Sequence, residues 1–284
     1  NLKNEITEFV LLNNNRPNNY NFLYDFIILN SKIEENKIIL DLSQLKDDQV
    51  LKEKFKRINP RISYNVFGTK TGRLTCKKGT FPILTLKKEL RKIIKPKNDF
   101  FVEIDFNSDQ LRTFLGLNEI SQPKIDIHNW HRELYEKNIG LIERDAVKIW
   151  FFKWLYGNNK ISSGIKEIDQ AYNRTNLLSK FWDGNKVTNP FNREIISDEF
   201  HALVNLIQST SSDIFLRRIL AVFELIKEKK SFIHCLIHDS FVLDFSKEDK
   251  PMLREIIKTF SQTELGEYRT SIKMGYNLGE MKEI

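Results

Sequence analysis

The sequence predicts an α+β fold, in which an antiparallel sheet and long helices are grouped along the chain. The run Phe100–Phe106 is rich in aromatic and β-branched residues and is predicted to be a strand. Residues 231–245 contain two strand-like runs that meet at a turn, which is typical of a hairpin. Between these segments, residues 198–227 show helical periodicity over several turns. Strands and helices do not alternate, so a doubly wound sheet is disfavoured.

The remaining elements are assigned in chain order. Residues 1–20 are rich in Asn and are expected to form a loop or a frayed end, and 22–42 carry two apolar stretches that allow a hairpin. Residues 160–198 are polar and are expected to be irregular, with short helical stretches, and 270–274 resemble a final strand. Five segments have the pattern of helices: residues 44–58, 110–117, 126–138, 142–155 and 248–262. Gly157-Asn158-Asn159 is a stop signal after the fourth of them.

Composition limits the class of protein. A chain of 284 residues can form one large domain or two small ones with a real core. No segment approaches the roughly 20 apolar residues that span a bilayer, so we expect no membrane partner. Two cysteines make a disulfide framework improbable and favour a reducing cytoplasm. The chain starts with Asn, which suggests a trimmed or excised piece.

Positive charge is concentrated in one segment. The net charge is +7, and residues 77–97 hold eight Lys or Arg residues against the single acid Glu89. Such a run is compatible with a solvated surface and with a track along a phosphate backbone, and composition alone does not separate the two. The basic residues are Lys77, Lys78, Lys87, Lys88, Arg91, Lys92, Lys95 and Lys97.

Two aspartates lie where buried strands would present them. Asp105 is inside the run Phe100–Phe106, and Asp239 lies between the two runs of the predicted hairpin. Carboxylates that converge can hold two divalent metal ions about 4 Å apart, and such a pair drives in-line phosphoryl transfer.

A basic and aromatic stripe lies between the two aspartates. Arg144, Lys148, Phe152 and Tyr156 recur every four residues, so on a helix each step drifts by only about 40° and all four share one side. The cations could hold phosphates and the rings could pack on a sugar and base. An ordinary amphipathic helix, with the rings in the core, is the alternative for the stripe by itself. With the two aspartates, it points to an enzyme that polymerises nucleotides.

Two histidine groups could suggest a metal other than magnesium. They lie at residues 126–131 and 234–238, but neither has a second Cys/His cluster, so zinc is not expected. Strand alternation also places Cys235 on the face opposite the two histidines beside it. We expect His234 and Cys235 to be packing residues.

Six segments, in order, resemble the motifs of the family A DNA polymerases, the bacterial DNA polymerase I and phage replicative type. The spacing Arg-x3-Lys-x3-Phe-x3-Tyr-Gly of residues 144–157 is similar to the fingers-helix signature of that family. The resemblance runs from about residue 64 to the C-terminus. The other five segments are Thr71-Gly-Arg-Leu74, Asp105-Phe-Asn-Ser-Asp-Gln-Leu-Arg112, Asp126-Ile-His128, Gln208-Ser-Thr-Ser-Ser-Asp213 and His238-Asp-Ser240.

The resemblance implies a right-hand polymerase core with an antiparallel-sheet palm, helical fingers and a thumb that is short or absent. Residues 66–120 and 199–284 would form the palm, and 121–198 the fingers. Residues 1–65 are of uncertain role, as a thumb remnant or a palm extension. The implied activity is template-directed addition of deoxynucleotides to a primer 3′ end.

The resemblance also implies roles for single residues. Asp105, Asp239 and the backbone carbonyl of Phe106 would bind two Mg²⁺ ions, with Mn²⁺ as a possible substitute, and Lys148 would act in catalysis. The residues expected to bind the incoming nucleotide are Gln110, His128, Arg144, Lys148, Phe152 and Tyr156. The residues expected to contact DNA are Arg73, Gln208, His238, Lys77, Lys78, Lys87, Lys88 and Arg91.

The chain departs from the family pattern at several places. Gln110 replaces the Glu that closes off the ribose 2′ position, and Ser240 replaces the Glu that follows the second aspartate. Ser209 stands for a Gly, and Val204 for an Asn. At the position of Phe152, family members with Phe disfavour nucleotides that lack the 3′-hydroxyl, and members with Tyr tolerate them.

These departures leave alternatives open. One is a polymerase or primase with relaxed sugar selection. Another is a catalytically weak nucleic-acid-binding subunit that keeps the fold. A third is a module that needs a separate thumb, processivity or replisome protein before it binds DNA tightly. The compact, divergent sequence favours a phage-like replication system in the cytoplasm, the host's if the source is viral. Its partners would be primer–template DNA and dNTPs.

Overall fold

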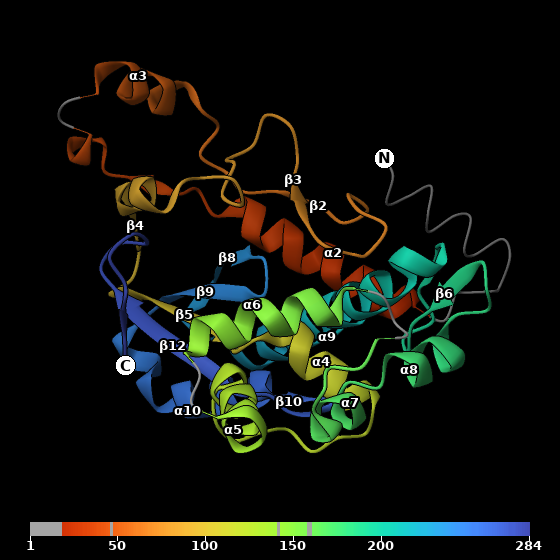
Figure 1. Ribbon diagram of the computed structural model, residues 1–284. Coiled ribbons are helices and arrows are strands. Elements are labelled where there is room, and N and C mark those ends of the chain that lie inside the picture. Colours follow the sequence, from red (N-terminus) through yellow and green to blue (C-terminus); the bar gives the residue numbers. More distant parts are fainter. Residues whose placement is uncertain (1–18, 46–47, 141–142, 158–160) are drawn as a thin grey trace, which may run out of the picture.

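A five-stranded antiparallel sheet forms the centre of the computed structural model, which describes residues 19–45, 48–140, 143–157 and 161–284 (Figure 1). The strand order is β13-β12-β5-β9-β8. The bounds are β5 Phe100–Phe106, β8 Phe232–Ile237, β9 Ser240–Phe245, β12 Thr270–Gly275 and β13 Lys282–Glu283. The predicted strand at 100–106 and the predicted hairpin are confirmed, and β12 confirms the strand at 270–274, although β13 follows it.

The β8–β9 hairpin turns in two residues. Ile237 pairs with Ser240, so His238 and Asp239 form the whole turn. His238 has φ of 58°, in the left-handed region that a tight turn of this kind requires. A register shift between Ile233 and Cys235 adds a bulge to β8. The turn therefore presents two polar side chains at one end of the sheet.

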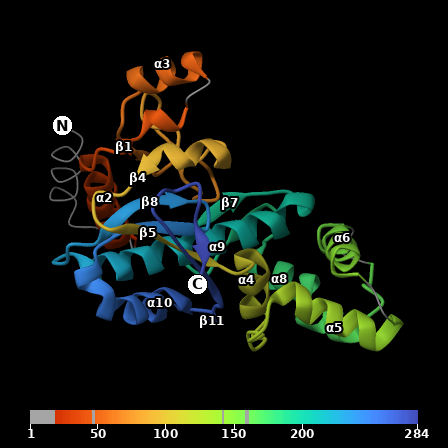
Figure 2. The ribbon, with the colours of Figure 1, turned by 90° about the vertical axis from the view of Figure 1, so that its left-hand side faces the viewer.

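The long helix α9 (Glu199–Ile226) packs along the sheet and organises the chain around it. Asp198 caps its first turn by accepting a hydrogen bond from the backbone of His201 at 2.9 Å. Figure 2 shows α9 and α10 (Leu253–Ser261) on one face of the sheet. The other face lies toward α3 (Gln49–Arg57) and the 3₁₀ helix η2 (Lys88–Ile93) (Figure 2). The predicted helices at 198–227 and 248–262 are thus confirmed, the latter with a 3₁₀ start, η3 (Lys247–Met252), and the helix predicted at 44–58 is confirmed for its α3 part.

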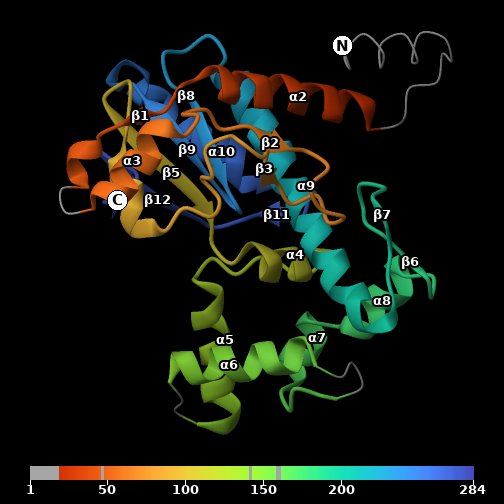
Figure 3. The same cartoon turned by 90° about the horizontal axis from the view of Figure 1, so that it is seen from above.

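A second, helical part lies away from the sheet (Figure 3). It comprises α5 (Ile127–Ile139), α6 (Arg144–Leu155), α7 (Lys166–Ala171) and α8 (Arg174–Phe181). The helix α4 (Asp109–Leu117) follows β5 directly and connects the sheet to this part. Two hydrophobic cores result, one around the sheet and one among α4 to α8. The beginning of α9 packs in the helical core and its end in the sheet core.

Two predicted elements are wrong. Residues 22–42 do not form a hairpin, because α2 (Tyr20–Glu35) buries Phe26, Leu29 and Ile33 at helical spacing against the sheet core. The next segment, β1 (Ile39–Leu40), pairs with β4 (Ile94–Lys95). Residues 160–198 also hold a small hairpin, β6 (Lys186–Thr188) with β7 (Glu194–Ile196), which was not predicted.

Short elements complete the structure. The pairs are β2 (Tyr64–Asn65) with β3 (Thr75–Cys76), and β10 (Gln262–Thr263) with β11 (Gly266–Glu267). A 3₁₀ turn, η1, spans Leu42–Gln44. The predictions for residues 1–18 and for Asn158-Asn159 lie outside the described residues. In the part of the chain that is described, no helix is both long and apolar enough to cross a membrane.

Candidate active site

Asp105 and Asp239 meet at one end of the sheet. Strand β5 pairs with β9 in a register that sets Asp105 opposite Ser240, the residue after Asp239. The backbone N–H of Phe106 also donates to the carbonyl of Asp239 at 3.5 Å. Residues more than 130 positions apart in the sequence therefore share one end of the five-stranded sheet, called the site end below.

The charges at this end of the sheet favour binding of a cation. Burial raises the pKa of Asp105 to about 7, with further contributions from the negative charges of Asp239 and Glu103. Burial also raises the pKa of Asp109 to about 7, and the charge of Asp239 adds to it. Two positive charges oppose this effect, because Lys273 lowers the pKa of Asp105 and Arg73 lowers that of Asp109. The site end thus carries excess negative charge, which metal ions would neutralise.

The donor set is compatible with magnesium. Mg²⁺ prefers oxygen ligands and is often held by one or two carboxylates, with waters and substrate phosphates completing its shell. Asp105, Asp239 and the Phe106 carbonyl can provide such oxygens. Among the described residues, no three Asp, Glu, His or Cys side chains lie close enough together to hold one ion by themselves. The protein's share of the ligands would therefore be small, as expected for a site shared with a nucleotide.

Glu103 was not predicted as a site residue. It lies two positions before Asp105 on the same face of β5, because side chains alternate along a strand. Ser240 Oγ donates to Glu103 Oε1 at 3.2 Å, and Lys273 Nζ lies 3.7 Å from Glu103 Oε2. Only its tertiary partners on β9 and β12 reveal its position beside the aspartates.

Asp109 is a second acid that sequence reasoning missed. It begins α4 after Ser108, which has a left-handed φ of 57°. Its side chain is buried, Ser211 Oγ on α9 donates to Oδ2, and Oδ1 has no partner among the described residues. The residue lies between two helices of the palm-like part, and its pattern in the sequence is that of an ordinary helix N-terminus.

The predicted triphosphate residues lie together on α5 and α6. His128 is buried, and its ring lies 5.8 Å from the ring of Phe152. Burial lowers the pKa of His128, and the positive charges of Lys148 and Arg144 lower it further. Arg144 donates to Asp126 at 3.0 Å and to Asn129 at 3.1 Å. The guanidinium is thus engaged by the N-terminus of α5 in this conformation.

The C-terminal half of the stripe reaches α4. The rings of Phe152 and Tyr156 are parallel, with centroids 6.1 Å apart. The Tyr156 hydroxyl donates to Gln110 Oε1 at 3.5 Å, the outer limit of a hydrogen bond. This contact connects the fingers-like helix α6 to the residue after Asp109.

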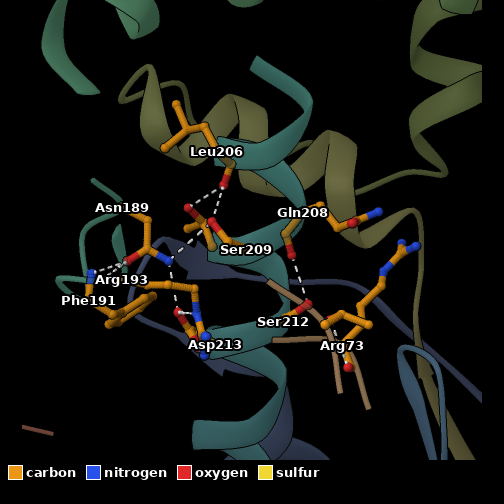
Figure 4. A network of polar contacts seen from close by, with 11 residues as sticks. Arg73, Asn189, Phe191, Arg193, Leu206, Gln208, Ser209, Ser212 and Asp213 are labelled. Atoms are coloured by element: carbon orange, nitrogen blue, oxygen red, sulfur yellow. Dashed lines mark hydrogen bonds and ion pairs between the residues drawn. The ribbon is translucent and has the colours of Figure 1, made fainter. Parts of the chain in front are cut away.

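The Thr71-Gly72-Arg73 loop packs against α9. Thr71 Oγ1 donates to Gln208 Oε1 at 2.8 Å, and the amide NH₂ of Gln208 donates to no other described residue, so it is available to a ligand. Gly72 has φ of +81°, and a Cβ there would lie 2.7 Å from Arg193 Nη2, so the loop requires glycine for both reasons. Figure 4 shows the side chains of Arg73 and Gln208 extending to the same side.

An ion pair behind this loop fixes the small hairpin to α9 (Figure 4). Arg193 donates to both oxygens of Asp213, at 2.7 and 3.0 Å, and Asn189 donates to the same carboxylate at 2.8 Å. Ser209 accepts from Asn189 at 3.4 Å. Asn205, which follows Val204, does not join this network, because its amide donates to Ser197 Oγ at 2.7 Å. The departure at Ser209 therefore belongs to this structural network.

One pocket is lined by several of the predicted site residues. Its lining includes Arg73, Asp109, Gln110, His238 and Asp239, which come from the loop, from α4 and from the hairpin turn. The predicted DNA-contact residues Arg73 and His238 and the predicted metal ligand Asp239 are thereby brought together.

The predicted basic track is divided between two places. Lys77 and Lys78 lie in the turn after β3, Lys87 to Lys92 lie in or just before η2, and Lys95 and Lys97 follow it. Lys77, Lys78, Lys87 and Lys88 are exposed and Arg91 is half-buried. Arg91 Nε donates to the backbone carbonyl of Leu86 at 3.3 Å. Four of these five side chains are therefore available to an anionic partner.

His131, His234 and Cys235 pack in the interior, as expected for His234 and Cys235, whereas His201 is exposed. Burial lowers the pKa of His234 to about 4, and its ring lies 4.9 Å from that of Phe101. Burial raises the pKa of Cys235. His131 Nε2 lies 2.7 Å from the Tyr172 hydroxyl.

The comparisons identify the fold. No family model matches the chain, and no curated protein matches it. Among solved structures, the chain is similar to the POL domain of Pol1 from M. smegmatis, in complex with DNA primer–template and dNTP. The TM-score is 0.61 at 15% sequence identity, over 78% of this chain and 48% of that one. The chain thus spans about half the length of the protein it matches.

This similarity confirms the predicted α+β fold and the structural resemblance to a family A polymerase domain. At 15% identity it carries no further conclusion about activity.

Proposed function

We propose that this chain is a template-directed DNA polymerase, which adds deoxynucleotides to the 3′ end of a primer with Mg²⁺, or Mn²⁺, as cofactor. The observation that carries the proposal is the pairing of β5 with β9, which sets Asp105 and Asp239 side by side in a region of excess negative charge. The domain boundaries and the role of each site residue are part of the same proposal, as is a cytoplasmic location.

The site end would hold the reacting ends. Asp105, Asp239 and the Phe106 carbonyl would bind the metal ions. When bound, two such ions lower the pKa of the primer 3′-hydroxyl and neutralise the leaving pyrophosphate. Asp105 must be ionised to bind, so its raised pKa means that metal and proton compete for the same carboxylate.

The fingers-like helices would hold the incoming dNTP. His128, Arg144 and Lys148 would contact the triphosphate, and Phe152 with Tyr156 would face the sugar and base. Arg144 must first exchange its bond to Asp126 for one to phosphate. Hydrogen bonds from Asn107 and Arg144 lower the pKa of Asp126 in spite of its burial. Asp126 therefore stays charged and binds the Arg144 guanidinium when no nucleotide is present.

The remaining residues would bind primer–template DNA. Arg73, Gln208 and His238 would lie on the minor-groove side of the primer terminus, where every base pair presents an acceptor. A free NH₂ group on Gln208 and the guanidinium of Arg73 are both donors, which suits that groove. The exposed lysines of residues 77–88 would contact the phosphate backbone. A separate thumb, processivity or replisome protein is a further possible partner.

Primer extension tests the proposal. The wild-type chain should extend a labelled primer with dNTPs and Mg²⁺, and chelation should stop it. Asp105→Ala and Asp239→Ala should each abolish extension while DNA binding persists, because neither residue is assigned to the DNA path. Asp25→Asn, at an exposed acid on α2, is the matched control and should keep full activity. Extension by either active-site variant would contradict the two-metal assignment.

The same assay separates the alternatives. The weak contact between Gln110 and Tyr156 favours relaxed sugar selection as a variant of the proposed function. Ready extension with NTPs, or synthesis without a primer, would identify the sugar-relaxed polymerase or the primase. DNA binding without any extension would identify the catalytically weak nucleic-acid-binding subunit.

A further inference from the structure

Glu103 lies next to Ser240, the position at which the sequence lacks an expected negative charge. The residue after Asp239 is the neutral Ser240, although the resemblance leads one to expect an acid there. Ser240 is the cross-strand partner of Asp105, and its one hydroxyl proton has two acceptors, Glu103 Oε1 at 3.2 Å and the backbone carbonyl of Ile237 at 3.0 Å. A carboxylate is therefore present beside Ser240, but it comes from β5 and not from β9.

The position of Glu103 is fixed from two sides. Ser240 contacts one carboxylate oxygen, and Lys273 on β12 lies 3.7 Å from the other. The Glu103 side chain is only 17% exposed, so its charge is only partly screened by solvent. Its charge acts on Asp105, which is two residues away on the same strand face.

We propose that Glu103 supplies a further negative charge to the metal centre, in place of the acid missing after Asp239, and that Ser240 helps to hold it in position. This inference rests on the proposed function, since it concerns the same centre. Glu103 is a positioning residue and not a direct ligand, because it does not form a three-carboxylate cluster with the aspartates among the described residues. It acts through its charge, and Lys273 moderates that charge.

If Glu103 acts through its charge, substitutions at Glu103 and at Lys273 should change cation affinity in opposite directions. Removing the negative charge of Glu103 should weaken cation binding at the centre. Removing the positive charge of Lys273 should strengthen it. A purely structural ion pair would behave differently, because loss of either partner would remove the same contact and change binding in the same direction.

Binding of Mn²⁺ to the protein without DNA or nucleotide tests this, with the free-ion signal measured by electron paramagnetic resonance. The isosteric variant Glu103→Gln should bind about tenfold more weakly, the order expected when a unit charge near a divalent ion is removed from a partly buried site. Lys273→Gln should bind more tightly. Glu267→Gln, at an exposed acid on β11, is the control and should bind like the wild type.

Moving the charge is the sharper test. The double variant Glu103→Ser with Ser240→Glu exchanges the two side chains between β5 and β9. It should recover most of the affinity that Glu103→Ser loses, while a substitution that only damages packing would gain nothing from the second change. If the double variant does not fold, the opposite signs of Glu103→Gln and Lys273→Gln still decide the question.

The outcomes separate this inference from the proposed function. Unchanged Mn²⁺ affinity in Glu103→Gln, equal losses in Glu103→Gln and Lys273→Gln, or no Mn²⁺ binding by the wild type would each overturn the role of Glu103. Primer extension by the wild type would leave the polymerase proposal standing in those cases. Conversely, charge-dependent Mn²⁺ binding by a protein that extends no primer would support Glu103 and refute the polymerase proposal.

Discussion

Replacing Asp105 by Asn should stabilise the metal-free protein at pH 8. The pKa of Asp105 in the folded protein is about 7, against an ordinary value of 3.8, with burial as the largest cause. A carboxyl group with a raised pKa contributes stability below its unfolded-state pKa and loses it as the pH rises through the folded-state pKa. At pH 8 the carboxyl group of Asp105 is ionised, so nearly the full free-energy cost of burying this charge lowers the stability of the folded protein.

The difference between 3.8 and about 7 corresponds to about 4 kcal/mol at most. Because Asp239, Glu103 and Asp109 share this charge cluster, relaxation among them reduces the gain, and we expect about 1–2 kcal/mol. Among the described residues no hydrogen bond to the Asp105 carboxylate is formed, so the isosteric amide loses none. For a chain of this size the gain corresponds to a rise in Tm of about 2–6 °C.

Thermal unfolding in the presence of a chelator is the assay, at pH 8 and at pH 5. At pH 5 the gain should be about half or less, because most of the cost develops between those values. Asp183→Asn is the control. Backbone hydrogen bonds from Asn185 and Lys186 lower the pKa of Asp183, so its removal should bring no gain. A lower Tm for Asp105→Asn at pH 8, or the same gain at both pH values, would refute the reasoning.

Three further predictions concern substrate and DNA. Gln110→Ala should raise ribonucleotide incorporation in competition with dNTPs and Gln110→Glu should lower it, and equal ratios in both variants would remove Gln110 from the sugar site. Phe152→Tyr should increase dideoxynucleotide incorporation with little change for dNTPs; an unchanged ratio would mean that α6 does not face the sugar. Affinity for primer–template should fall steeply with salt, and replacing four lysines with Gln should reduce the log–log slope by up to about 3.6, about 0.9 for each lysine. An unchanged slope would show that these lysines are merely solvated. The four are Lys77, Lys78, Lys87 and Lys88.

Much of the fold could be predicted from local patterns. The strand Phe100–Phe106 and helix α9 are long and strongly periodic, and Asp198 is an N-cap residue of the preferred type. Helix α2 was mistaken because Phe26, Ile27 and Ile28 form an aromatic and β-branched run that is also typical of strands. Burial against the sheet core, which local propensity does not contain, decides for the helix. The β6–β7 hairpin has strands of three residues, too short for a periodic signal.

The candidate site divides in the same way. Asp105, Asp239 and the stripe from Arg144 to Tyr156 could be found because they belong to spaced motifs. Glu103 and Asp109 could not, because their significance depends on neighbours in other strands and helices. The hydrogen bond from Ser240 to Glu103 joins residues 137 positions apart, and no local pattern signals it.

The division of the interior into two cores has a consequence for how this chain can change. The sheet core and the helical core share α9, and they meet along a stretch of small buried side chains at residues 209–212. Away from α9 and Leu265, which pack against both cores, mutational effects in the two cores should combine additively, since distant sites without shared partners rarely couple. Each core is then free to diverge in its own way. The small side chains of residues 209–212 leave the least room for added volume. Substitutions in the sheet core and in the helical core therefore constrain each other at this stretch.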